Sequence, residues 1–295
     1  MVENNKVVIA LGYFDGVHKG HQMVIEKAKS VAKERGYKVV VFTFGGDLKK
    51  ITKKNNGGTI YSLEEKTLII NQLGVENIFV APVSKSFLSK GKLAFLKFLN
   101  KNYNVKAYVC GKDYKFGKNG GDVNFLTLYA RQNQQEVFVV KDVFLHGEKI
   151  SSTIIKEHLK KAKLDTASEM LGHNYFILGK VVSDRHKGSN IGFPTANVKL
   201  NGQKCLLKKG VYIGKILVGG TYYKAIINYG NRPTFDLDET LLEAHLIDFN
   251  GNLYGKTIKI EFLEFIREIK KFSNEEELIA RLNLDLKLAK EKVYD

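Results

Sequence analysis

The stretch Gly12-Tyr13-Phe14-Asp15-Gly16-Val17-His18-Lys19-Gly20-His21 joins a predicted strand to a predicted helix. The preceding Val7–Leu11 is short and rich in β-branched residues, which predicts a strand. In the following His21–Arg35, apolar residues recur at helical spacing, and Gly36 predicts the end of the helix. Glycine lets the backbone approach a ligand closely, and a helix start presents unpaired N–H groups to anions. The stretch therefore predicts a ligand site at the carboxyl end of the first strand.

The alternation of strand and helix continues through the first half of the chain. A second helix is predicted from Ser62, because Ser62 and Glu65 form a capping-box pair ahead of an apolar run. Such alternation is typical of an α/β fold, in which helices cover both faces of a parallel sheet. The further strands predicted in this half are Lys38–Phe44, Asn77–Ala81, Val105–Cys110 and Glu136–Val140.

From about Tyr175, strand-like segments follow one another without intervening helices. Gly219-Gly220 between two of them predicts a hairpin turn, and consecutive strands of this kind predict an antiparallel barrel or sandwich. A final helix capped by Ser273 should pack on these strands. The predicted strands are Tyr175–Val182, Val211–Val218, Tyr222–Asn228, Leu241–Phe249 and Thr257–Phe265. The packing face of the final helix consists of Leu278, Leu282, Leu286 and Ala289.

Length and composition agree with two folded domains. The chain has 295 residues, and a domain typically takes roughly 100–200 residues. Leu164–Leu171 predicts a linker helix that ends at Gly172, so the predicted domains are residues 1–171 and 172–295. Hydrophobic residues make up 44% and charged residues 26% of the chain, as in globular proteins.

The formal net charge of +16 favours anionic partners. The lysines are scattered without a long basic block, so we expect phosphorylated small molecules as partners and no nucleic acid. The apolar run at Val7–Leu11 is much shorter than the ~20 residues that span a bilayer, so no membrane association is predicted. Cys110 and Cys205 lack metal-type spacing, which predicts free thiols in the reducing cytoplasm.

The first candidate site is the pair His18 and His21. Because they are three residues apart at a helix start, both imidazoles can face one phosphate chain and donate hydrogen bonds to charge developing on it. The alternatives are a zinc half-site and surface histidines in a glycine turn. A zinc site would need a third ligand, and no nearby cysteine or histidine supplies one.

The second candidate site is Lys187-Gly188-Ser189-Asn190-Ile191-Gly192-Phe193-Pro194-Thr195-Ala196-Asn197. Gly188 and Gly192 flank a loop that could wrap phosphates with its N–H groups, and Lys187 adds charge. Thr195 and Asn197 could offer oxygens to Mg²⁺, which prefers such ligands. The alternative is a polar hairpin turn.

Several of these segments resemble the bacterial bifunctional riboflavin kinase/FAD synthetase family, within the nucleotidyltransferase superfamily. In the first half the resemblance is carried by residues 12–21, by Gly111-Lys112-Asp113-Tyr114-Lys115-Phe116-Gly117-Lys118 and by Ile150-Ser151-Ser152-Thr153-Ile154-Ile155-Lys156. In the second half it is carried by Gly192-Phe193-Pro194-Thr195-Ala196-Asn197, Ile227–Phe235 and Glu243–Phe249.

The resemblance implies a Rossmann-like nucleotidyltransferase domain followed by a small antiparallel β-barrel riboflavin kinase domain with a C-terminal helix. It implies that ATP, with Mg²⁺, phosphorylates riboflavin to FMN, and that a second ATP adenylates FMN to FAD with release of pyrophosphate. It implies catalytic roles for His18, His21 and Glu243, and metal ligation by Thr195 and Asn197. The implied nucleotide-binding residues are Gly12, Phe14, Asp15, Gly20, Ser151, Ser152, Thr153, Lys156, Lys187, Gly188 and Gly192. The implied flavin-binding residues are Asp113, Phe116 and Arg267.

Two positions depart from the family pattern. Lys156 stands where the family usually has arginine, and Gly45-Gly46-Asp47 replaces a Pro-His-Pro-like turn. A lysine offers a point charge in place of a bidentate fork. The first alternative function is therefore a riboflavin kinase with an impaired adenylyltransferase domain. The others are a non-catalytic flavin-binding module and a nucleic-acid binder.

Overall fold

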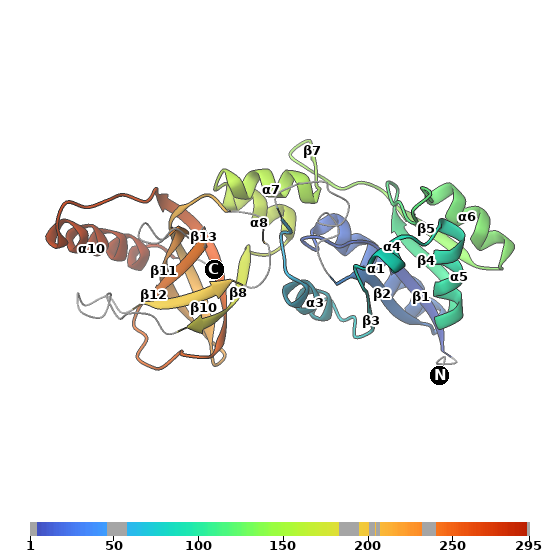
Figure 1. Cartoon of the computed structure of the whole chain (residues 1–295), viewed down its shortest axis with the longest axis horizontal. Coiled ribbons are helices and arrows are strands. Elements are labelled where there is room, and N and C mark those ends of the chain that lie inside the picture. The colour runs from blue at the N-terminus through green and yellow to red at the C-terminus, as the bar shows by residue number, and fades with distance from the viewer. Residues whose placement is uncertain are drawn as a thin grey trace. The chain divides into compact units, whose positions relative to one another are not determined.

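The chain forms two compact units in the computed structural model (Figure 1), Met1–Ile154 and Ile155–Asp295. The structure describes residues 5–45, 58–182, 195–200, 204, 207–231 and 240–293. The domain boundary predicted at residues 171 and 172 stays a prediction.

The first unit is built on a five-stranded sheet with strand order β3-β2-β1-β4-β5, and all its pairings are parallel. Every residue from Val7 to Leu11 in β1 is at most 5% exposed, so both faces of this central strand are covered. This confirms the predicted α/β architecture. The strands are β1 (Lys6–Leu11), β2 (Lys38–Phe44), β3 (Ile78–Ala81), β4 (Asn104–Gly111) and β5 (Glu136–Val140).

The helices of this unit follow the predicted start and stop signals closely. Gly36 ends α1 with φ of 65° in the left-handed region. Ser62 and Glu65 form the predicted capping box of α3. Helix α1 begins two residues earlier than predicted, directly after His18. The helices are α1 (Lys19–Arg35), α3 (Leu63–Gln72), α4 (Lys85–Leu88), α5 (Lys92–Asn102) and α6 (Val123–Gln132), and a hairpin of β6 (Phe144–Leu145) and β7 (Glu148–Lys149) follows β5.

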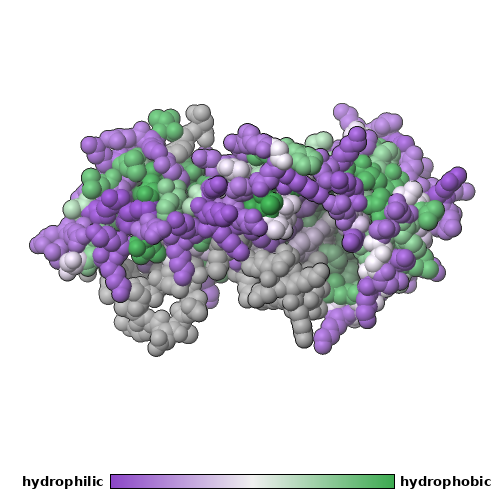
Figure 2. Space-filling view, turned by 90° about the horizontal axis from the view of Figure 1, so that it is seen from above, coloured by the Kyte–Doolittle hydropathy of each residue, from purple (hydrophilic) through white to green (hydrophobic). Residues whose placement is uncertain are grey.

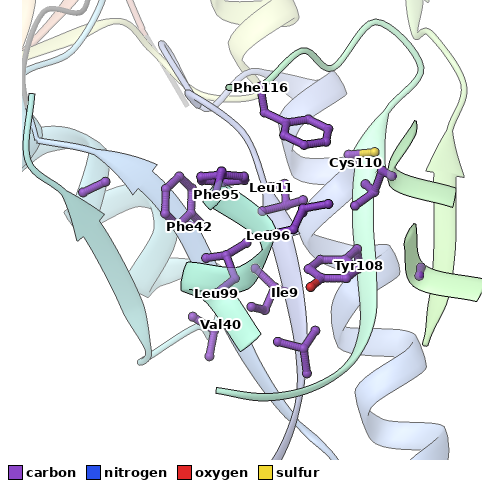
Figure 3. Packing of buried hydrophobic residues seen from close by; sticks show 14 of the residues in the cluster. Ile9, Leu11, Val40, Phe42, Phe95, Leu96, Leu99, Tyr108, Cys110 and Phe116 are labelled. Atoms are coloured by element: carbon purple, nitrogen blue, oxygen red, sulfur yellow. The ribbon is translucent and has the colours of Figure 1, made fainter. Parts of the chain in front are cut away.

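Helix α5 covers one face of the sheet with a hydrophobic cluster (Figure 3). Leu96 and Leu99 of α5 meet Ile9 of β1 and Tyr108 of β4 there, and all four are fully buried. Burial also raises the pKa of the Cys110 thiol to about 12, so this thiol is protonated and unreactive at neutral pH.

The second unit is a closed antiparallel barrel with strand order β10-β11-β12-β9-β8-β13. Of the two predicted alternatives, the antiparallel barrel is therefore confirmed and the sandwich is wrong. Gly219 and Gly220 both have positive φ at the hairpin between β10 and β11, as predicted. Strand β9 was missed, because its start was interpreted as a turn. The strands are β8 (Phe176–Val182), β9 (Ala196–Leu200), β10 (Gly210–Val218), β11 (Thr221–Asn231), β12 (Thr240–Leu246) and β13 (Thr257–Arg267).

Helix α7 (Ser152–Lys160) begins in the first unit and ends in the second, and the second unit also contains α8 (Leu164–Leu171) and α10 (Glu275–Glu291). The predicted cap of α10 at Ser273 is wrong by one residue. Asn274 is the cap, because its side-chain oxygen accepts a hydrogen bond from the Glu277 N–H at 2.8 Å. Leu286 and Ala289 of the predicted packing face do pack against the apolar surface of the barrel.

A buried carboxylate ties α10 to the barrel. Asp285 is 1% exposed, and its Oδ2 accepts hydrogen bonds from Arg267 Nε at 2.9 Å and Nη2 at 2.7 Å. Arg281 Nε lies 3.1 Å from the other carboxylate oxygen. Two cations therefore compensate one buried charge, which favours a single docked position of the helix.

Among the coloured residues of Figure 2, hydrophilic residues are spread over the face and are interspersed with smaller hydrophobic areas. This agrees with the scattered distribution of the lysines in the sequence. In the part of the chain that the structure describes, no helix has the length and apolar character needed to cross a membrane.

Replacing Asp285 by alanine should destabilise the second unit by roughly 3 kcal/mol, because Arg267 is left as a mostly buried cation without its partner. Glu291→Ala is the matched control on the same helix, since it removes an exposed pair with Lys287 and should cost less than about 0.5 kcal/mol. The measurement is urea unfolding monitored by hydrogen exchange and mass spectrometry, which gives the free energy of unfolding of each unit separately. Equal losses in the two variants would contradict the expectation.

Candidate active sites

The loop between β1 and α1 adopts a backbone conformation that most residues avoid. Phe14, Gly16 and Val17 have φ of 53°, 87° and 42°. The left-handed region is open to glycine but strained for a β-branched valine. The Val17 N–H donates to the Phe14 carbonyl oxygen at 3.2 Å, which closes a tight turn. The turn brings His18 to the start of α1.

The structure brings the two predicted histidines together. The rings of His18 and His21 are stacked, with centroids 3.7 Å apart and an interplanar angle of 19°. The ring of Phe14 meets His21 edge-on at 5.2 Å. The glycines make room for these rings: a Cβ on Gly12 would lie 2.8 Å from the Phe14 ring, and one on Gly20 would lie 3.2 Å from the His18 ring.

Burial keeps both imidazoles neutral. It lowers the pKa of His18 from 6.5 to about 4. The pKa of His21 is lowered well below its usual value, first by burial and then by the repulsion that a protonated His21 would feel from protonated His18 and from Lys66. A neutral imidazole has one donor and one acceptor nitrogen. The Nδ1 atoms of both rings are buried and make no hydrogen bond within the described part of the chain, so each keeps unused hydrogen-bonding capacity.

Two further contacts hold the loop from the side of Asp15, which is 4% exposed. Its Oδ1 accepts a hydrogen bond from the Ile60 N–H at 2.8 Å, and its carbonyl oxygen accepts one from the Ser152 hydroxyl at 2.7 Å. Of the neighbours of Ser152, Ser151 is half-buried and Thr153 is exposed. The start of α7, predicted to bind nucleotide, therefore lies beside the histidine loop. Lys156 is buried farther along the same helix.

Lys66 also belongs to this site, although it is not among the residues predicted from the sequence. It is 5% exposed, and burial lowers its pKa to about 8 although the charge of Asp15 raises it. Its Nζ donates to the Tyr13 carbonyl oxygen, in the loop after β1, and to the Thr43 hydroxyl oxygen near the end of β2. The sequence does contain a signal for it. Lys66 lies at helical spacing from Ile69 and Ile70, on the buried stripe of α3, where a lysine is rare unless its charge is paired.

The predicted flavin-binding residues have structural partners of their own. Phe116 is 7% exposed and stacks on Tyr114 with ring centroids 5.6 Å apart. Asp113 is exposed and accepts a hydrogen bond from Lys149 Nζ at 2.5 Å. Arg267 lies at the end of β13 in the second unit and pairs with Asp285.

Two of the residues predicted for riboflavin phosphorylation, Asn197 and Glu243, lie on neighbouring strands of the barrel. Glu243 of β12 is directly opposite Asn197 of β9 and Asn228 of β11, so the three occupy one row across the strands. The Oδ1 atom of Asn197 is buried and makes no hydrogen bond within the described ranges. Thr195 is half-buried just before β9. Lys187, Gly188 and Gly192 lie outside the described residues.

Among the described residues there is no group of three or more His, Cys, Asp or Glu side chains that could hold a metal ion. An orphaned amide oxygen at Asn197 does fit Mg²⁺, which prefers oxygen ligands and keeps several waters.

Both halves of the chain match known families. Residues 1–154 match the model of FAD synthetase, and residues 171–293 match the model of riboflavin kinase. A bifunctional riboflavin kinase/FMN adenylyltransferase from Bacillus subtilis is 36% identical over 96% of this chain and 91% of its own. The chain belongs to the bifunctional riboflavin kinase/FMN adenylyltransferase family.

Another relative carries the same family name, and a solved structure with a different description shares the fold. The protein of the same name from Haemophilus influenzae is 34% identical over 96% of this chain and 92% of its own. A crystal structure described as a macrolide-efflux protein from Streptococcus pneumoniae aligns with a TM-score of 0.88 and 30% identity, over 99% of this chain and 96% of that one. The resemblance noted from the sequence motifs is confirmed, and both the fold and the bifunctional activity follow from the family.

Histidine titration checks the electrostatics of the first site. The ring resonances of His18, assigned with the variant His18→Gln, should titrate near pH 4 in NMR spectra of the ligand-free protein. The physical reason is the burial of the ring. Because the folded pKa is lowered, the stability contributed by neutral His18 is present above pH 6.5 and is lost as the pH falls toward 4. A midpoint near 6.5 would show that the ring is solvated.

Proposed function

We propose that FMN is adenylated at His18 and His21. An oxygen of the FMN phosphate attacks the α-phosphorus of ATP, a new P–O bond forms, and the bond to pyrophosphate breaks. The histidines donate hydrogen bonds to the charge that develops on the transferring phosphoryl group. The observation that carries this proposal is the pair of buried Nδ1 atoms without a hydrogen-bond partner among the described residues, at the start of α1.

Helix α1 supports the same role. His18 is its N-cap residue and makes no side-chain capping bond, so the first N–H groups of the helix are not capped by that ring. Unpaired N–H groups and the helix dipole favour a phosphate at this position. Neutral imidazoles supply no positive charge. They therefore donate hydrogen bonds to the phosphoryl oxygens and do not neutralise the negative charge of the phosphates. Gly12, Phe14 and Gly20 shape the site, and Asp113 and Phe116 bind the flavin.

Riboflavin is phosphorylated on the barrel, at the row formed by Asn197, Glu243 and Asn228. Glu243 accepts the proton of the primary ribityl hydroxyl. The oxygen of that hydroxyl attacks the γ-phosphorus of ATP, and ADP leaves. Thr195 and Asn197 would hold Mg²⁺, which supplies positive charge to the phosphates when bound. The orphaned Oδ1 of Asn197 beside Glu243 supports this assignment.

The remaining assignments follow the family. The adenylyltransferase domain comprises residues 1–171 and the kinase domain 172–295. Lys187, Gly188 and Gly192 bind the nucleotide of the kinase reaction, and Arg267 contacts the flavin. The enzyme is cytoplasmic and its partners are small molecules, with no nucleic acid among them.

A product assay tests the pair of activities directly. The purified chain is incubated with riboflavin and excess Mg-ATP, and the flavins are separated over time. FMN should appear first and FAD should follow. FMN without FAD would favour the alternative of a kinase with an impaired first domain, and no product from folded protein would leave a flavin-binding module.

His21→Ala should lower the rate of FAD formation by about 100-fold, because one preorganised donor is lost from the transition state. The conversion of riboflavin to FMN should stay within about twofold of wild type, since that reaction uses the other domain. His146→Asn is the control, because His146 is exposed and asparagine tolerates its left-handed backbone. Both rates are read from the same chromatograms, and an equal fall in both would argue against separate sites.

Glu243→Gln should produce the opposite pattern. Loss of the general base lowers the rate of FMN formation by about 100-fold or more, while adenylation of added FMN continues at the wild-type rate. Asp248→Asn is the matched control, because Asp248 is an exposed acid just after β12 with φ of 57°, which asparagine accepts. Kinase activity that survives Glu243→Gln would exclude Glu243 as the base.

A further inference from the structure

Lys66 closes a small hydrogen-bond triangle beside the histidine pair. Its Nζ donates to the Tyr13 carbonyl oxygen at 3.1 Å and to Thr43 Oγ1 at 3.0 Å. The Thr43 hydroxyl in turn donates to the same Tyr13 oxygen at 2.9 Å. A third bond runs from Nζ to the Phe44 carbonyl oxygen at 3.0 Å. The side chain thereby links α3, the loop after β1 and the end of β2.

These contacts saturate the ammonium group. It has three protons to donate, and the oxygens of Tyr13, Thr43 and Phe44 accept all of them. The Tyr13 ring lies under the same group, with its centroid 4.9 Å from Nζ, and stabilises the cation. While these bonds hold, no proton of Lys66 is left for a substrate phosphate. Lys66 therefore acts on the protein and not on the ligand.

The Tyr13 oxygen that Lys66 holds directly precedes the strained turn. Phe14 and Val17 keep left-handed φ values of 53° and 42° only because the surroundings over-determine them. Ile60 and Ser152 fix the turn at Asp15, and Lys66 fixes it on the side of β1. Removal of the lysine would delete the hydrogen bond that holds the Tyr13 carbonyl oxygen, where the turn leaves the sheet.

We propose that Lys66 is a positioning residue for adenylyl transfer, which sets the place of the His18–His21 pair by tying the loop after β1 to the end of β2. This inference rests on the proposed adenylation of FMN at that pair. Because Lys66 makes no bond to substrate, its loss should lower kcat for FAD formation and leave the KM for FMN and ATP within about threefold.

The experiment compares Lys66→Met with Lys66→Arg, Thr43→Val and the control Lys29→Met in the full-length chain. Lys29 also donates to a backbone oxygen, that of Leu73, but away from the histidines. We expect Lys66→Met to lower kcat for FAD formation by about 10- to 100-fold, the range for misplacing a catalytic group. Lys66→Arg, which keeps a charge and donors, should recover part of that loss, and Lys29→Met should lower kcat less than twofold.

Thr43→Val removes one corner of the triangle and leaves the lysine. If both residues act through the Tyr13 oxygen, the double variant Thr43→Val/Lys66→Met loses less activity than the product of the two single effects. Riboflavin phosphorylation by the same molecules is the internal control and should stay unchanged. Hydrogen exchange of residues 12–18 supplies a readout independent of activity, and it should accelerate in Lys66→Met and not in Lys29→Met.

The outcomes separate the two proposals. If wild type makes FAD and Lys66→Met retains its kcat, the positioning role is overturned and the adenylation site stands. A rise in KM with unchanged kcat also overturns it, since that result indicates a direct substrate contact. No FAD from wild type overturns both. If Lys66→Met does not fold, the same criteria apply to Lys66→Gln, which retains two of the donors.

Discussion

The histidine pair depends on a turn whose backbone is unfavourable in isolation. Left-handed φ values at Phe14 and Val17 are costly for these residue types, by about 1–3 kcal/mol each. The surrounding structure holds them with buried or partly buried hydrogen bonds from three elements: Lys66 of α3, the segment at Ile60, and Ser152 at the start of α7. The rest of the first unit can be viewed as the support for this turn, because the parallel sheet brings those elements to one edge.

Burial of the turn also determines what chemistry its side chains can perform. An exposed histidine pair would be partly protonated near neutral pH, and two charged rings stacked at 3.7 Å would repel each other. Burial and the charge of Lys66 keep His21 neutral instead. In the barrel, the unpaired polar atom is uncharged from the outset. The buried Oδ1 of Asn197 has no hydrogen-bond partner among the described residues and is an oxygen that suits a cation. Both sites therefore keep polar atoms unpaired within the described structure.

The sequence predicted regular elements better than it predicted interactions across them. Helix ends at Gly36 and Ser62 and the hairpin at Gly219-Gly220 were predictable, because glycine conformation and capping are local effects. Strand β9 was not, because its polar residues after a proline are equally typical of a turn. Lys66 was missed for a different reason. Its role depends on the carbonyl oxygens of Tyr13, in the loop after β1, and of Phe44, at the end of β2, which only the folded sheet brings to it.

The contacts of Ser152 narrow how the start of α7 can meet a nucleotide. Its hydroxyl has one proton, and that proton is donated to the carbonyl oxygen of Asp15. Phosphate oxygens are acceptors, so the hydroxyl has nothing further to offer them while this bond persists. The backbone N–H groups of Ser152 and Thr153 are donors at the first turn of the helix, where the dipole also favours an anion. The Ser152 side chain therefore serves the turn that carries the histidines, and the donors left for a phosphate at this end of α7 are the backbone N–H groups and the hydroxyls of Ser151 and Thr153.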